Sequence, residues 1–550
     1  MGDANTALSR RGVLAAGAAS LALGLGPRVV QAGQGEGPAV DRAAILATMK
    51  RATRFMTDTV AVGDGYVWAY TPDFSRRWGE LEAYPSMIWV QPPGTATMGH
   101  LFLDAYHATG DEDYYVAATR VADALARGQH PSGGWHYMID TAGEESLNRW
   151  YDTIGKNAWR LEEFQHHHPN ATFDDVTTAD AAIFMLRVFW EKKDARYRAP
   201  LDKAIAFVLD SQYPIGGWPQ RYPRAPNAGL HGMPDYTGYI TFNDDVSAEN
   251  IKFLTFCRQT LGGPGLDDAI RRAMDCFIAT QQPAPQPGWA MQYTVDDLQP
   301  AAARTYEPRA LATHATAGNL DQMMDFYVLT GDRKYLARIP EAIDWLEKIA
   351  LPPERRRDGR SHTTYVEIGS NDPLFIHRRG SNVVNGRYYV TKKADDIVVH
   401  TGGFRSIDTE GLRARYEELA SRPPQVVSRG SALLARPGTV PLPKYYTTRD
   451  FRVSDLNSGG LGTHAEATGA ERVAQLVGGL NAEGYWSSPL ASISNPYVAD
   501  STDAVAPGEF RITRVGDASD TSPYFTDFPQ EGISTGVYIR HMGELISALE

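Results

Sequence analysis

The fold is decided by a short turn that reads QYPIGGW at residues 212–218. A related turn reads QHPSGGW at residues 129–135, and residues 281–289 begin with QQP and end with GW. Proline and glycine end a helix, and a tryptophan behind the glycines can fold back across the helix end. The three turns therefore predict three helices that finish in the same way and belong to one repeating unit.

A second repeat marks the opposite ends of the helices. Residues 109–114 read TGDEDY and residues 330–335 read TGDRKY, 221 positions apart (331 − 110 = 221). Two further helix breaks, at 193–194 and 262–264, divide this interval into three steps of about 74 residues. We predict four antiparallel helix pairs between about residues 95 and 350, forming an all-α-dominated α/α toroid with long loops and a few short strands on one rim. An open superhelix of helix pairs is the alternative.

Two acidic stretches begin helices at the rim that carries the tryptophan turns. Residues 172–177 read TFDDVT and residues 241–247 read TFNDDVS, so that Asp174 and Asp244 are 70 positions apart (244 − 174 = 70). In a ring of hairpins, helix starts of this kind and the three tryptophan turns share one rim. The long connections gather there too, and long loops on one face of a rigid scaffold are where sites form. We expect the functional site at this rim.

Asn243, Asp244 and Asp245 form an oxygen-rich run that is a candidate metal site. Acidic residues at a helix start ordinarily cap the helix and complement its dipole, and this is the preferred interpretation of Asp174 and Asp175. Three oxygen-bearing side chains in a row exceed what one cap needs, and Ca²⁺ binds oxygen clusters of this kind. The run therefore favours a calcium site over a simple cap.

Arginines face this acidic rim from the stretch 355–393, which is basic within a chain of net charge −12. Arg378 and Arg379 follow a strand-like run and could present guanidinium groups to carboxylates. Acidic oxygens and arginines together fit an acidic polysaccharide, whereas the net charge argues against a nucleic-acid partner. The histidines at 166–168 are interpreted as a polar loop, because adjacent histidines rarely converge on one ion.

The first 32 residues resemble an export signal. Arg10 and Arg11 precede the apolar run 13–25, and a small-residue site ends at Ala32, as in a twin-arginine signal peptide. We expect a secreted or periplasmic protein with no membrane contact after cleavage; a disordered tail is the alternative. The remainder is divided into a catalytic toroid at 40–400 and an extension at 401–550 packed on it, and we expect a monomer.

Four blocks of sequence resemble polysaccharide lyase family 10, the pectate lyases. They are QYPIGGWPQRYP at 212–223, TFNDD at 241–245, PAAARTYE at 300–307, and EIGSN at 367–371 with Pro373 and Phe375 behind it. The blocks keep the family's order and spacing over roughly residues 165–380. Two positions depart from the family: residues 292–294 read QYT where it has Gln-His-Asp, and Asp372 stands where it has the arginine of Asn-Arg-Pro.

The resemblance implies an α/α toroid and calcium-assisted anti-β-elimination of polygalacturonate, in which an arginine takes the C5 proton. It makes Asn243, Asp244 and Asp245 the calcium residues. Arg378 aligns best with the catalytic arginine, and Arg379 is its neighbour. The substrate-binding residues it implies are Trp218, Arg221, Tyr222, Arg304 and Tyr306.

Three other functions remain open from the sequence. A lyase for a different uronate polysaccharide would keep the same site. A toroid glycoside hydrolase would use two carboxylates from among Asp174, Asp244 and Glu307, with no metal and no arginine base. A sugar-binding protein without activity would keep only the aromatic residues of the rim.

Overall fold

The structure is a computed structural model that describes residues 41–158, 161–225, 233–379, 387–395, 397–398, 402–448, 468–490, 493–494, 497, 520–522 and 531–550. The predicted signal peptide therefore lies outside the described residues. None of the described helices is long and apolar enough to cross a membrane. Cys257 and Cys276 are buried free thiols.

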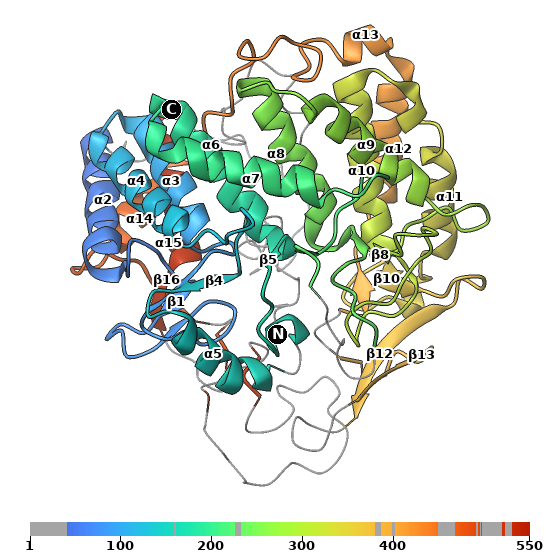
Figure 1. The fold of residues 1–550 in the computed structure, drawn as a ribbon, viewed down its shortest axis with the longest axis horizontal. Coiled ribbons are helices and arrows are strands. Elements are labelled where there is room, and N and C mark those ends of the chain that lie inside the picture. Colours follow the sequence, from blue (N-terminus) through green and yellow to red (C-terminus); the bar gives the residue numbers. More distant parts are fainter. Residues whose placement is uncertain are drawn as a thin grey trace, which may run out of the picture.

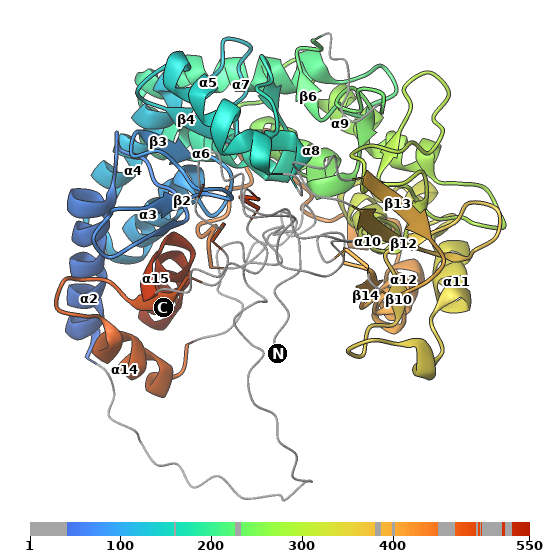
Figure 2. The same cartoon turned by 90° about the horizontal axis from the view of Figure 1, so that it is seen from below.

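Four antiparallel helix pairs stand where the sequence predicts them. Figure 2 shows them following one another along an arc, and with their neighbours they form the predicted α/α toroid. The pairs are α3 (Thr95–Thr109) with α4 (Glu112–Arg127), α6 (Thr177–Lys192) with α7 (Arg198–Ser211), α8 (Val246–Thr260) with α9 (Leu266–Thr280), and α10 (Thr313–Thr330) with α11 (Ile339–Ile349).

The Thr-Gly-Asp repeats stop one helix and start the next. Gly110 and Gly331 adopt left-handed conformations with φ of 72° and 70°, which glycine reaches without a side-chain clash. The following aspartates, Asp111 and Asp332, accept hydrogen bonds from backbone N–H groups two residues further on. The same local chemistry therefore places both turns at the same kind of helix junction.

The tryptophan turns each tie a helix end to the start of a later helix. The buried indoles of Trp135, Trp218 and Trp289 donate Nε1–H to the carbonyls of Leu125 (2.9 Å), Val208 (2.8 Å) and Phe277 (3.0 Å). Their own carbonyls accept backbone N–H bonds from the residues that lead into α6, α8 and α10. Because Thr241 donates to the Trp218 carbonyl, this turn lies at the same rim as Asp244, as the sequence predicts.

The turn recurs beyond residue 400, where the sequence showed only a weak pattern. Trp486 donates its indole N–H to Leu476 at the end of α14 (Ala470–Gly479), at 2.9 Å. The chain then passes through β15 (Ser487–Pro489) and β16 (Glu531–Ser534) into α15 (Thr535–Leu549), which packs on α2 (Arg42–Phe55) and α3. The C-terminal helix is therefore part of the helix layer.

Residues 431–447 lie across helices α6 and α8. Arg258 of α8 donates to the carbonyl of Ala432, and Arg187 of α6 donates to that of Lys444. Arg187 also forms a buried ion pair with Asp104 of α3 (2.7 Å). The described parts of 401–550 thus pack on the toroid, while the division at residue 400 stays a prediction.

Short strands line the rim of the acidic stretches (Figure 1). One sheet has the order β13-β12-β11-β9 and another the order β15-β16-β1-β2; the pairs β3-β4, β5-β6, β7-β8 and β10-β14 stand alone. Their bounds are β1 Ala69–Tyr70, β2 Arg77–Trp78, β3 Met87–Trp89, β4 Met138–Asp140, β5 Ala171–Thr172, β6 Arg221–Tyr222, β7 Ile240–Thr241, β8 Gln292–Tyr293, β9 Leu311–Ala312, β10 His362–Thr363, β11 Tyr365–Val366, β12 Pro373–Arg379, β13 Arg387–Thr391 and β14 Phe404–Arg405. The remaining helices are α5 (Glu144–Thr153), α12 (Thr409–Ser421) and α13 (Pro424–Val427).

Candidate active site

Two acidic turns with the same backbone meet at the rim. They are the 3-10 turns Asp174–Val176 and Asn243–Asp245, which lie in contact. Each holds two consecutive non-glycine residues at positive φ: Asp175 (47°) and Val176 (63°) in the first, Asp244 (51°) and Asp245 (56°) in the second. Such conformations cost of order 1–3 kcal/mol each and concentrate at functional sites.

The two turns match with an offset of 69, not the 70 expected from the sequence. The hydroxyl of Thr178 donates to the Thr172 carbonyl (2.6 Å), and that of Ser247 donates to the Thr241 carbonyl (2.8 Å). Both offsets are 69 (247 − 178 and 241 − 172). Asp244 therefore corresponds to Asp175 rather than to Asp174, because the backbone conformation fixes the correspondence.

A group of buried and half-buried carboxyl groups surrounds one arginine at this point. We call it the carboxylate cluster; its members are Glu80, Glu162, Glu163, Asp174, Asp175, Asp244 and Glu307, around Arg304. The side chains arrive from both acidic turns and from loops that are distant in sequence. Buried carboxyl groups in this number need compensating charge or protons.

Arg304 supplies part of that compensation. Its Nη1 lies 3.3 Å from Glu163 Oε2 and 3.7 Å from Asp174 Oδ2. Its Nη2 lies 3.2 Å from Asp244 Oδ2 and 2.9 Å from Glu307 Oε1. Burial acts to lower the pKa of Arg304, but Glu307 and the other surrounding anionic groups outweigh it and hold the pKa well above its usual value. Arg304 is therefore a fixed positive charge at the centre of the cluster.

Asp174 and Asp244 hydrogen-bond to each other, and their pKa values shift in opposite directions. Burial alone would raise the pKa of Asp174, but Arg304 and the Tyr137 hydroxyl, which donates to Asp174 Oδ2 at 2.5 Å, lower it below the usual value. Burial and then the charge of Asp174 raise the pKa of Asp244 well above its usual value. Asp174 therefore holds the charge and Asp244 the proton.

Two further carboxyl groups of the cluster, those of Glu80 and Glu162, also have raised pKa values. Gln91 donates to Glu80 Oε2 (2.8 Å) and to Asp175 Oδ2 (2.7 Å). Burial, then the charge of Glu163, raises the pKa of Glu80 to about 8. Burial also raises the pKa of Glu162 to about 8, although the carboxylate accepts the Thr305 backbone N–H at 3.1 Å.

The donor set suits a hard cation. Its ligand atoms are carboxylate oxygens, and the buried Asp174 Oδ1 has no hydrogen-bond partner within the described part of the chain. Among the described residues, however, no group of three or more His, Cys, Asp or Glu side chains is spaced to hold an ion as it stands. The Arg304 guanidinium occupies the space between four of the carboxyl groups. The chemistry of the residues therefore fits calcium, with Asp174, Asp175 and Asp244 as the groups that would hold it.

The structure separates the three residues predicted to bind metal. Asp244 belongs to the cluster. Asn243 donates its amide to Asp244 Oδ2 (2.5 Å) and to Glu307 Oε1 (3.3 Å), so it orients carboxylates. Asp245 is half-buried at the end of the turn and occupies the position of Val176 in the matching turn.

Arg378 lies two aromatic rings away from the cluster. It is buried on β12, with its guanidinium carbon 5.1 Å from the centre of the Tyr388 ring. The Tyr388 ring lies 5.4 Å from that of Tyr306, whose hydroxyl donates to Glu163 Oε2 at 3.2 Å. The backbone of Arg379 pairs with Arg387, and its side chain lies outside the described part of the structure.

One predicted substrate-binding residue is wrong. Trp218 is fully buried, because its indole closes the end of α7, and it cannot stack on a sugar. Tyr222 is half-buried with its ring 5.6 Å from that of Phe207. Arg304 lies at the centre of the cluster, and Tyr306 lies at its edge. Arg221 lies beside the cluster, with its guanidinium carbon 5.3 Å from the centre of the Tyr137 ring.

Three members of the carboxylate cluster could not be predicted from a sequence pattern. Glu80 stands in an irregular loop, and Glu162 and Glu163 stand in the 3-10 turn Glu162–Phe164. None of them belongs to a repeated motif, and only the three-dimensional path of the chain brings them to Arg304. Asp174 and Asp175 do carry a signal, since their stretch repeats at Asp244, although the sequence favours a helix cap as their role.

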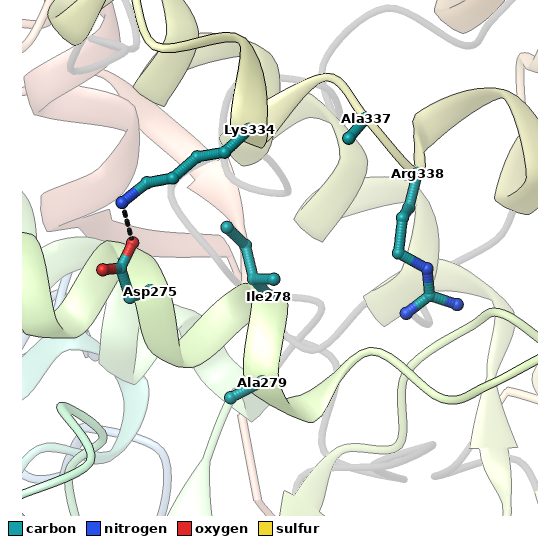
Figure 3. A pocket seen from close by; sticks show the side chains of 6 residues that line it. All are labelled: Asp275, Ile278, Ala279, Lys334, Ala337 and Arg338. Carbon is teal, nitrogen blue, oxygen red and sulfur yellow. Dashed lines mark ion pairs between the residues drawn. The ribbon is translucent and has the colours of Figure 1, made fainter.

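A separate pocket of about 460 Å³ lies between α9 and the residues before α11 (Figure 3). Its only drawn ion pair joins Lys334 to Asp275 at 2.7 Å. It is lined by Asp275, Ile278, Ala279, Lys334, Ala337 and Arg338, none of which belongs to the carboxylate cluster.

Comparison with known proteins gives the class of this protein. Residues 141–389 match the family model described as pectic acid lyase. This stretch contains every member of the carboxylate cluster except Glu80, together with Arg378. The protein is therefore a polysaccharide lyase. This match confirms the resemblance to the pectate lyases that the sequence predicts.

Solved structures with a similar arrangement include three enzymes. A family 10 polysaccharide lyase from Cellvibrio cellulosa is 18% identical, with a TM-score of 0.35, over 58% of this chain and 91% of that chain. A mutant of the lyase from that organism, in complex with trigalacturonic acid, is 18% identical, with a TM-score of 0.33, over 59% and 96%. Cellobiose 2-epimerase from Spirochaeta thermophila is 12% identical, with a TM-score of 0.38, over 60% and 74%. Among curated proteins there is no significant match.

Proposed function

We propose that this polyuronate lyase is a calcium-assisted pectate lyase that cleaves polygalacturonate by anti-β-elimination. The carboxylate cluster carries the proposal, because seven carboxyl groups surround a single arginine. Several of them take up protons in the absence of another cation, as the raised pKa values of Glu80, Asp175 and Asp244 indicate. A divalent cation would replace those protons.

Asp174, Asp175 and Asp244 are the residues that would hold calcium. When bound, calcium would fix the uronate carboxylate of the substrate and stabilise the negative charge that develops next to C5. Arg304 keeps Asp174 ionised, while Gln91 and Asn243 orient Asp175 and Asp244 through their amide groups. The two raised pKa values mean that Asp175 and Asp244 must each release a proton to act as ligands.

The elimination needs a base at C5 of the uronate. The base removes the C5 proton, the C–H electron pair forms the C4–C5 double bond, and the C4–O bond breaks. The electrons of that bond go to the glycosidic oxygen, which takes up a proton. Arg378 is the first candidate for the base and Arg379 the second. A clamp for the substrate carboxylate is the competing role for Arg378, because a guanidinium group can bind a carboxylate through two parallel hydrogen bonds.

The geometry does not favour the glycoside hydrolase alternative for the pair Asp174 and Asp244. Two catalytic carboxyl groups of a glycosidase stand about 5–5.5 Å apart in retaining enzymes and about 6.5–9.5 Å apart in inverting ones. The carboxyl groups of Asp174 and Asp244 hydrogen-bond to each other, which leaves no room for a sugar between them. The lyase for a different uronate polysaccharide remains the second candidate.

Ultraviolet absorbance of the unsaturated product tests the proposal. We expect polygalacturonate to give this absorbance with calcium and to lose it with EDTA, and alginate or another polyuronate to give less. Reducing ends without absorbance would point to hydrolysis, and neither signal would point to a binding protein. Export is tested separately: Arg10→Lys with Arg11→Lys should retain the protein inside the cell if the twin-arginine route carries it.

A further inference from the structure

Five histidines from two loops gather beside the carboxylate cluster. We call them the imidazole patch: His130, His136, His166, His167 and His168. The first two flank the turn at Trp135, and the other three precede β5. The rings of His130 and His136 are 5.3 Å apart, and those of His136 and His167 are 5.8 Å apart. The interpretation of 166–168 as a polar loop does not reveal that these histidines meet His130 and His136.

The patch is an aromatic surface rather than a metal site. Tyr151 of α5 stacks on His167 with ring centres 5.0 Å apart, and the rings of His166 and His168 are 3.9 Å apart. All members except His168 are only half-buried. Burial lowers the pKa of every member, to about 3 for His136, so the rings are neutral near neutral pH. Within the described residues they are not arranged to hold a metal ion.

Arg221 lies under the patch, and its guanidinium has no ion pair among the described residues. Its side chain is 2% exposed, and its Nη2 has no hydrogen-bond partner in the described part of the chain. Its charge acts on four of the imidazole rings. A buried unpaired guanidinium is unfavourable, and an anion held over the patch would compensate it.

Arg221 also links the patch to the carboxylate cluster. It pairs with Thr172 across β5 and β6, two residues before Asp174. Its guanidinium lies against the ring of Tyr137, whose hydroxyl donates to Asp174. An extended substrate bound at the cluster would therefore continue over the patch.

We propose that the imidazole patch, with Arg221 beneath it, is a binding subsite for a second uronate residue of the same polysaccharide chain. The half-buried imidazole rings pack on the sugar, while Arg221 supplies the positive potential for its carboxylate. This inference rests on the proposed polyuronate substrate, because only a polymer reaches both places.

The test compares galacturonate oligomers of increasing length. In His136→Gln and His167→Gln, we expect KM for the hexamer and for polygalacturonate to rise roughly tenfold, with kcat and the rate on the shortest cleaved oligomer unchanged. His541→Gln is the matched control, because His541 is also largely buried with a pKa lowered to about 3, but lies against Trp486. Two patch variants are used so that a folding defect in one does not decide the result.

An unchanged KM for all lengths, or the same rise for every length, would overturn the subsite. Calorimetric binding of hexagalacturonate in EDTA gives the same comparison without turnover, with a weaker affinity expected only in the patch variants. If the wild-type protein gave no unsaturated product yet showed this loss of affinity, the proposed reaction would fall while the subsite stood.

Discussion

The two acidic turns share a backbone but not a charge state. Both hold two consecutive residues at positive φ, and both close with a hydroxyl that bonds back to a threonine carbonyl. The first turn places Asp174 against Arg304 and the Tyr137 hydroxyl, which lowers its pKa. The second places Asp244 against Asp174, which raises its pKa. Repetition therefore fixes where the carboxyl groups stand, and their neighbours decide which of them is ionised.

The largest expected effect concerns Arg378, the candidate base, which stands outside the two acidic turns. If Arg378 is the base, Arg378→Ala should lower kcat by about 10²–10⁴ with little change in KM. If it only clamps the substrate carboxylate, KM should rise instead. Arg378→Lys should rescue poorly in the first case, because lysine lacks the planar guanidinium. Near-wild-type turnover in Arg378→Ala and Arg379→Ala would remove both as bases.

The next effect measures the asymmetry of the two turns. In EDTA, Asp174→Asn should lower the free energy of unfolding by about 2–3 kcal/mol, because it removes a buried ionised partner of Arg304 and Tyr137. Asp244→Asn should change it by less than about 1 kcal/mol, because the amide mimics a protonated carboxyl group. Denaturant unfolding measures both, and equal losses in the two variants would refute different charge states.

The pH dependence of stability tests whether Glu162, another carboxyl group of the cluster, is protonated in the folded protein. A carboxyl group whose folded pKa is raised binds its proton more tightly in the folded state, so stability is present below the unfolded pKa and is lost as pH rises towards the folded value. For Glu162 that window runs from its ordinary pKa of about 4.3 to about 8, at about 1.4 kcal/mol per pH unit. In EDTA, Glu162→Gln should flatten the fall in stability over this window. A slope that stays the same would show that Glu162 is not protonated in the folded protein.

The smallest effect concerns the backbone of the second turn. Asp245 has φ of 56°, a region that glycine reaches without strain. Asp245→Gly, measured in EDTA, should therefore raise the free energy of unfolding by up to about 1 kcal/mol. Gly110→Ala is the opposite control at a φ of 72° and should lower it. A loss of stability in Asp245→Gly would mean that the aspartate side chain outweighs the backbone strain.

Much of the fold followed from short-range patterns in the sequence. The turns at Trp135, Trp218 and Trp289 and the Thr-Gly-Asp junctions use local hydrogen bonds, so their spacing predicted the four helix pairs. The turn at Trp486 was missed because its flanking glycines differ, although its indole makes the same bond.

The site was only partly predictable for a different reason. The repeat drew attention to Asp174 and Asp244, but a one-residue shift in the alignment hid the correspondence with Asp175. Glu80 reaches Arg304 from an irregular loop and Glu163 from a single 3-10 turn, and such long-range convergence leaves no periodic trace in the sequence. Trp218 was assigned to the substrate because burial of a large aromatic residue cannot be read from its motif.

Calcium titration by calorimetry tests the central claim most directly. The claim is that the two acidic turns form one cation site, whose carboxyl groups bind protons when no cation is present. The experiment is repeated at one pH in buffers of different ionisation enthalpy, which gives the number of protons released. We predict that one Ca²⁺ binds per chain with release of at least one proton, and that Asp244→Asn binds more weakly and releases about one proton fewer. No calcium binding, or binding without proton release that Asp244→Asn leaves unchanged, would contradict the account.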